Sequence, residues 1–115
     1  MSATTAPPTA AADPATELLS VELQASLLRE LQRAWHGLNE GIFRGVLLSP
    51  TLALERSQTR LGLWQRHSRM LSMSLPLCLK QPWVVVLEVL KHEMAHQYVS
   101  EILGRTADDT EGPHG

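Results

Sequence analysis

The spacing of apolar residues changes twice along this chain, and these changes separate helices from strands. From about Thr16 to Gly41, apolar side chains recur at steps of three and four residues, which predicts a helix with one apolar face. That face consists of Leu23, Leu27, Leu31, Ala34 and Leu38. Either Thr16 or Ser20 is a suitable N-terminal cap for this helix.

Three short stretches in the middle of the chain alternate apolar and polar residues, as strands with one buried face do. The apolar positions are Leu52 and Leu54, Leu61 and Leu63, and Leu71, Met73 and Leu75. Because only short polar segments separate these stretches, we predict a small three-stranded antiparallel sheet. The residues between Pro76 and Pro82 are predicted to be a linker.

The helical spacing returns at Trp83 and continues to Leu103, with Gly104 as the predicted stop. Pro82 suits the first turn of this second helix. The order helix, three strands, helix predicts an α+β fold.

The 115 residues correspond to one domain, and 43% of them are hydrophobic, which is enough for a core. Residues 1–15 consist mainly of Ala, Thr and Pro, so we predict a disordered tail there and a domain over residues 16–115.

Charge and cysteine content exclude several classes of protein. A net charge of -2 argues against a basic nucleic-acid module, and a single cysteine, Cys78, excludes a disulfide framework. No apolar run approaches the roughly 20 residues of a membrane helix, and no secretory signal is visible. We therefore expect a cytoplasmic protein without a membrane partner; its oligomeric state is not predicted.

The second helical pattern contains the motif His92-Glu93-Met94-Ala95-His96. Four residues advance a helix by slightly more than one turn, so His92 and His96 share a face and can bind one zinc ion together. Glu93 is rotated by about 100° from His92, from where its carboxylate can reach a zinc-bound water as a general base. This arrangement is typical of zinc peptidases.

A catalytic zinc ion normally has three protein ligands. Glu101 is a poor third candidate, because it turns onto another side of the same helix. Spacing alone leaves four downstream residues open: Asp108, Asp109, Glu111 and His114.

The letters HEMAHQY, followed by a polar segment and GPHG, resemble the zinc-binding signature of the SprT-like metallopeptidase family. Residues 38–47 (LNEGIFRGVL) and 61–64 (LGLW) are similar to two further segments of that family. The similarity runs from about Leu23 to Gly115. It implies that His92, His96 and His114 are zinc ligands and that Glu93 is the catalytic base.

The resemblance also implies a zincin-like fold with the HExxH helix at the active site, and part of that fold is expected to lie beyond Gly115. The implied function is zinc-dependent hydrolysis of peptide bonds in protein or peptide substrates. Two alternatives remain open. One is a zinc-binding interaction module without turnover. The other is a DNA-associated protease that repairs protein crosslinks, for which DNA as a partner is implied only by the family.

Overall fold

A computed structural model describes residues 14–104 of the chain. The elements in chain order are α1 (Pro14–Gly41), β1 (Thr51–Glu55), β2 (Gly62–Gln65), β3 (Met70–Ser74), α2 (Leu75–Lys80), α3 (Trp83–Tyr98) and a π-helical turn, η3 (Val99–Leu103). This order confirms the α+β class. The tail predicted over residues 1–15 lies outside the described residues except for Pro14 and Ala15, which begin α1.

The sheet is mixed, and the prediction of an antiparallel sheet was wrong. The strand order is β1-β3-β2, with β1 parallel to β3 and β2 antiparallel to β3. Alternation of apolar residues predicts which side chains share a face, but it does not predict which strands pair. The central position goes to β3, whose last four residues are all buried, whereas β1 and β2 are the two edges.

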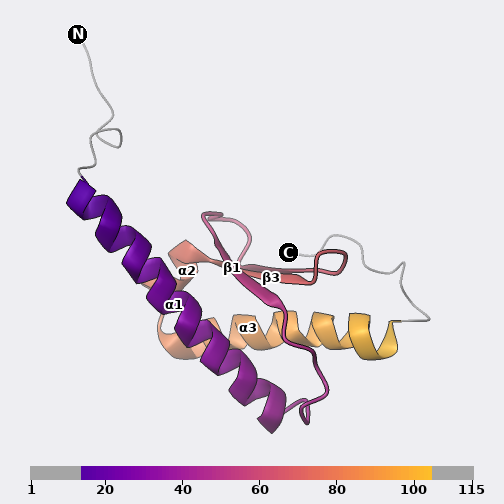
Figure 1. Ribbon diagram of the computed structural model, residues 1–115. Coiled ribbons are helices and arrows are strands. Elements are labelled where there is room, and N and C mark those ends of the chain that lie inside the picture. The colour runs from indigo at the N-terminus through magenta and orange to yellow at the C-terminus, as the bar shows by residue number, and fades with distance from the viewer. Residues whose placement is uncertain (1–13, 105–115) are drawn as a thin grey trace.

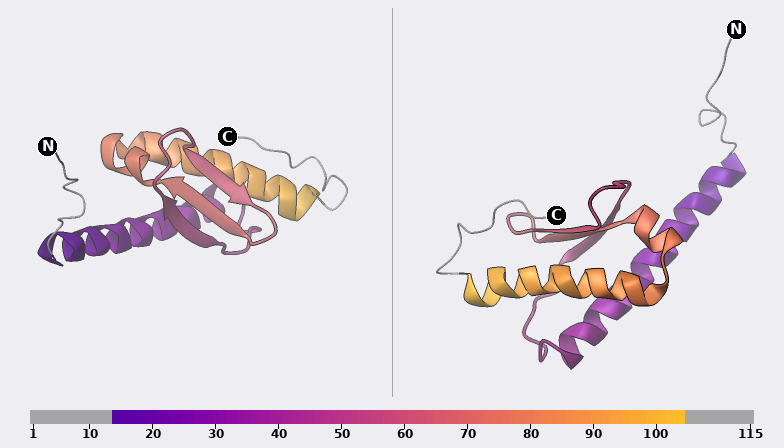
Figure 2. Two further views of the ribbon diagram at one scale, coloured as in Figure 1. Left: turned by 90° about the horizontal axis from the view of Figure 1, so that it is seen from above. Right: turned by 180° about the vertical axis from the view of Figure 1, so that it is seen from behind.

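The arrangement of the sheet and the two long helices is visible in Figures 1 and 2. One face of the sheet lies over α3, and α1 crosses α3 obliquely. The hydrophobic core lies where these elements meet and consists of Leu31, Trp35, Leu47, Trp64, Leu71, Met73, Leu77, Val86, Leu90 and Met94. Across residues 14–104, none of the helices combines the length and hydrophobicity that a membrane crossing requires.

The N-terminal half of α1 extends beyond the core (Figure 1). The predicted apolar face is only partly buried, because Leu23 is 49% exposed whereas Leu31 is fully buried. Trp35, which lies beside this face, is also buried. Burial of α1 therefore begins about halfway along the helix.

The predicted linker after β3 is a helix instead. The hydroxyl of Ser74 accepts a hydrogen bond from the backbone N–H of Leu77 (3.1 Å), and Pro76 lies in the first turn, so both residues favour helix initiation. Leu75, which the alternation places in the third strand, becomes the first residue of α2. Cys78 packs against the core from this helix, and burial raises the pKa of its thiol.

Candidate functional site

The helix α3 holds the three residues of the His-Glu-x-x-His motif. Pro82 is its N-terminal cap, and the carbonyl of Pro82 accepts hydrogen bonds from the backbone N–H groups of Val85 (2.9 Å) and Val86 (3.2 Å). The side chains of Val86, Leu90 and Met94 are buried in the core and fix the rotation of the helix. The opposite side of the helix carries the exposed side chain of His92 and the half-buried side chain of His96.

The imidazole rings of His92 and His96 converge. Their Nε2 atoms are 3.2 Å apart, and the ring planes are inclined by 81°. At this distance one ring nitrogen can donate a hydrogen bond to the other, or both can bind one metal ion. Two nitrogen ligands of one tetrahedral zinc ion are about 3.3–3.4 Å apart, so the spacing of the pair fits zinc.

Glu93 is 1% exposed and lies where α3 approaches β2. The approach is close because Gly62 of β2 has no side chain. A Cβ atom at Gly62 would be 2.9 Å from Cγ and 3.3 Å from Oε2 of Glu93. Gly62 was not predicted to be a site residue, although a glycine within a strand pattern is a known signal of close backbone approach.

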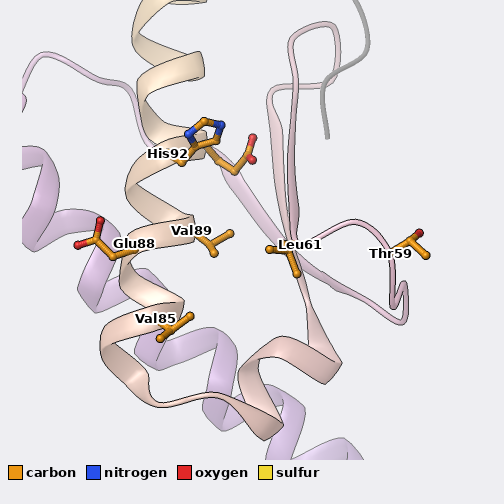
Figure 3. Close-up of a pocket in the computed structure, with 7 residues that line it drawn as sticks. Thr59, Leu61, Val85, Glu88, Val89 and His92 are labelled. Atoms are coloured by element: carbon orange, nitrogen blue, oxygen red, sulfur yellow. The ribbon is translucent and has the colours of Figure 1, made fainter.

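A cavity of about 400 Å³ opens beside the motif (Figure 3). Its lining residues come from the segment before β2 and from α3: Thr59, Leu61, Val85, Glu88, Val89, His92 and Glu93. His92 and Glu93 therefore face the same space. The cavity places the ring of a candidate metal ligand and the candidate base beside a volume that a substrate could enter.

Gln97, the residue after His96, anchors α3 to the rest of the molecule. Its side-chain oxygen accepts a hydrogen bond from Nε1 of Trp35 in α1 (3.2 Å), and its amide nitrogen donates to the carbonyl of Leu48 (2.8 Å). All of its side chain is buried. This contact could not be predicted from the sequence, because Trp35 and Gln97 are 62 residues apart and no spacing pattern pairs them.

Two acidic residues near the motif have partners other than a metal. Glu101 accepts a hydrogen bond from Nε of Arg69 (2.8 Å). Glu88 forms an ion pair with Lys91 (2.9 Å). Glu88 lines the cavity, but its carboxylate is turned away from Leu61 in Figure 3.

Of the three predicted ligands, His92 and His96 lie among the described residues. Within residues 14–104, no group of three His, Cys, Asp or Glu side chains is arranged to hold a metal ion. His114 and the competing Asp108, Asp109 and Glu111 lie outside the described residues.

Comparison with known proteins identifies the family. No curated protein and no solved structure matches this chain. The model of the SprT-like family, however, matches residues 31–115, which include β1–β3, α3 and the whole His-Glu-x-x-His motif. Because this match covers well over half of the sequence, the chain belongs to the SprT-like family.

Proposed function

We propose that this protein is a zinc-dependent metallopeptidase that hydrolyses peptide bonds of protein substrates, with Glu93 as the general base. The observation that carries the proposal is the convergence of His92 and His96, whose Nε2 atoms are 3.2 Å apart beside a buried carboxylate. Membership of the SprT-like family supports the same reading.

The ligand set of the proposal consists of His92, His96 and His114. The first two supply ring nitrogens at a spacing that fits zinc. His114 is included because of its resemblance to the histidine of the family's HG dipeptide. Three neutral imidazoles would leave the ion its full double charge, and when bound it would acidify a water molecule and polarise the scissile carbonyl.

Glu93 would accept a proton from the attacking water and donate it to the leaving amine. Its position suits this role, because it is adjacent to His92 on α3 and lines the same cavity. The close approach of Gly62 restricts where its carboxylate can move. Gly62 would thus hold the carboxylate of Glu93 in place as a base, while the histidines serve as the zinc ligands.

The outer edge of β2 would hold the substrate backbone. Among the described residues, no strand pairs with this edge. The N–H of Ser74 donates to the carbonyl of Leu61 (2.9 Å), so alternation along an antiparallel pair directs the backbone groups of Gly62 and Trp64 outward. A substrate paired there would be recognised through its backbone, which suits cleavage of varied sequences.

The test compares zinc content with cleavage of an unfolded protein. Glu93→Gln should retain one zinc ion per chain and lose cleavage, because the amide cannot accept the proton. His92→Ala and His96→Ala should lose the metal as well as the activity. His67→Ala is the matched control, since His67 is exposed and lies in the turn before β3.

Each outcome of this test has one meaning. Wild-type cleavage by Glu93→Gln would show that the assigned base is wrong. Stoichiometric zinc with no cleavage by the unmodified chain would identify the zinc-binding interaction module instead. A chain that binds no zinc would contradict both readings.

A further inference from the structure

The cavity beside His92 and Glu93 has apolar walls that the chemistry proposed above does not use. Val85 and Val89 are four residues apart, which places them on one face of α3. Figure 3 shows both side chains pointing toward Leu61 on the other wall. Leu61 is 48% exposed and Val85 is 36% exposed, although both are aliphatic. Exposed apolar side chains around a cavity next to a catalytic constellation are typical of a binding site.

The charges around the cavity disfavour an acidic occupant. None of its described lining residues is lysine or arginine. Glu93 adds a carboxylate to the lining, and none of the wall residues Leu61, Val85 and Val89 could pair with an anionic side chain. Glu88 offers little attraction to a basic group, because Lys91 already pairs with it at 2.9 Å. The lining therefore favours an uncharged apolar side chain.

The position of the cavity relative to β2 indicates which substrate residue would enter it. Thr59 and Leu61 line the cavity and precede β2, so the cavity lies toward the N-terminal end of that strand. A peptide added antiparallel to β2 runs in the opposite direction, and its C-terminal part lies at that end. The cavity would then receive a side chain on the C-terminal side of the bond that is cleaved near Glu93.

We infer that this cavity binds the side chain of the substrate residue directly after the scissile bond and selects a large apolar side chain there. Leu61, Val85 and Val89 form the contact surface. The inference rests on the proposed peptidase function, since it assigns the substrate preference of the same site.

The experiment digests a mixture of reduced and alkylated proteins with the zinc-loaded full chain, and mass spectrometry identifies the new N-termini. We expect leucine, isoleucine, methionine and phenylalanine to be about tenfold enriched over aspartate and glutamate at these N-termini. Val85→Glu should shift the preference toward lysine and arginine, because it adds a carboxylate to the wall. The matched control is Val84→Glu, since Val84 is 64% exposed and does not line the cavity. This control should leave the preference unchanged.

A binding measurement separates this inference from the proposed function. Two end-blocked peptides are compared, which are identical except that one has leucine where the other has aspartate. Each peptide is titrated into the Glu93→Gln variant and into the double variant Glu93→Gln, Val85→Glu. We expect about tenfold tighter binding of the leucine peptide, and loss of that difference with Val85→Glu. The same result without any cleavage by the unmodified chain would contradict the peptidase but uphold the cavity's selectivity.

Three results would overturn the inference. The first is cleavage with no preference after the scissile bond, and the second is an apolar preference only before it; both leave the peptidase standing. The third applies if the unmodified chain does not cleave: the two peptides then bind the Glu93→Gln variant equally well, or neither binds.

Discussion

Gly62 is the residue on which the surroundings of Glu93 depend most directly. It allows β2 to approach α3 so closely that any side chain would meet Glu93 and Val89, at 2.9 Å from Cγ of the former and 3.2 Å from Cγ1 of the latter. Both neighbours line the cavity. One missing side chain therefore determines the position of the candidate base and the width of the candidate subsite together.

Replacing this glycine should damage both stability and activity. Gly62→Ala should lower the free energy of unfolding by about 1–3 kcal/mol, because the added methyl group overpacks the contact with α3. Cleavage should fall further than stability explains, since Glu93 must move. Urea denaturation and a cleavage assay at a temperature where both proteins are folded measure the two effects.

Gly37→Ala provides the control for that substitution. Gly37 lies within α1, and a Cβ atom there would have no neighbour within 4 Å. Alanine should therefore raise the stability, by up to about 1 kcal/mol, through its higher helix propensity. A Gly62→Ala protein that is as stable and active as wild type would show that the contact with Glu93 is unimportant.

At the candidate site, the sequence predicted the residues that belong to a local motif. His92 and His96 share a helix face because of their spacing, and this follows from helix geometry alone. The contacts of Gly62 and Gln97 could not be predicted, because each depends on a partner distant in the chain. A local motif therefore predicts the candidate site residues, whereas the residues that position them can be identified only from the tertiary structure.

At the scale of elements, helices were easier to predict than strand pairing. The two long helices were predicted from the repeated spacing of apolar residues, and the structure has both. Their bounds differ slightly, because α1 begins earlier, at Pro14, and α3 passes into η3 after Tyr98. The mixed sheet was missed because the segment from Arg56 to Leu61 carries the chain past β3 rather than forming a hairpin. This arrangement leaves β2 as the edge next to the motif helix.

The contact between α1 and α3 depends on Gln97, and its loss should destabilise the whole arrangement. Gln97→Met keeps the side-chain length but removes the hydrogen bonds to Trp35 and Leu48. Since both partners are then left without this hydrogen bond, we expect a loss of about 2–3 kcal/mol in the free energy of unfolding. Gln32→Met on the exposed side of α1 should change it by less than about 0.5 kcal/mol. Equal stability of the two variants in chemical denaturation would contradict the anchoring role.

At the scale of the whole molecule, the family match and the buried core begin at the same residue. The match starts at Leu31, which is also the first fully buried residue of α1. Before it, Leu18, Leu19 and Val21 are each more than half exposed. The part of α1 that packs on the core thus coincides with the part that resembles the family.

Zinc should connect α3 to the end of the chain and stabilise the fold as a whole. A ligand that binds only the folded state at 100 times its dissociation constant adds about 2.7 kcal/mol of stability. For a domain of this size, that gain corresponds to a rise of roughly 10–20 °C in the unfolding midpoint. The full chain should show this rise on titration with zinc, followed by differential scanning fluorimetry, and should lose it when a chelator is added.

The same titration tests the third ligand, because replacing a histidine that binds zinc should diminish the zinc-dependent rise in the unfolding midpoint. His92→Ala and His96→Ala should abolish the rise, while Glu93→Gln and the exposed His67→Ala should preserve it. His114→Ala should reduce it strongly if the HG dipeptide supplies a ligand. An undiminished shift in His114→Ala would contradict that assignment and return the choice to Asp108, Asp109 and Glu111. An undiminished shift in both His92→Ala and His96→Ala would place the zinc elsewhere and remove the basis of the proposed function.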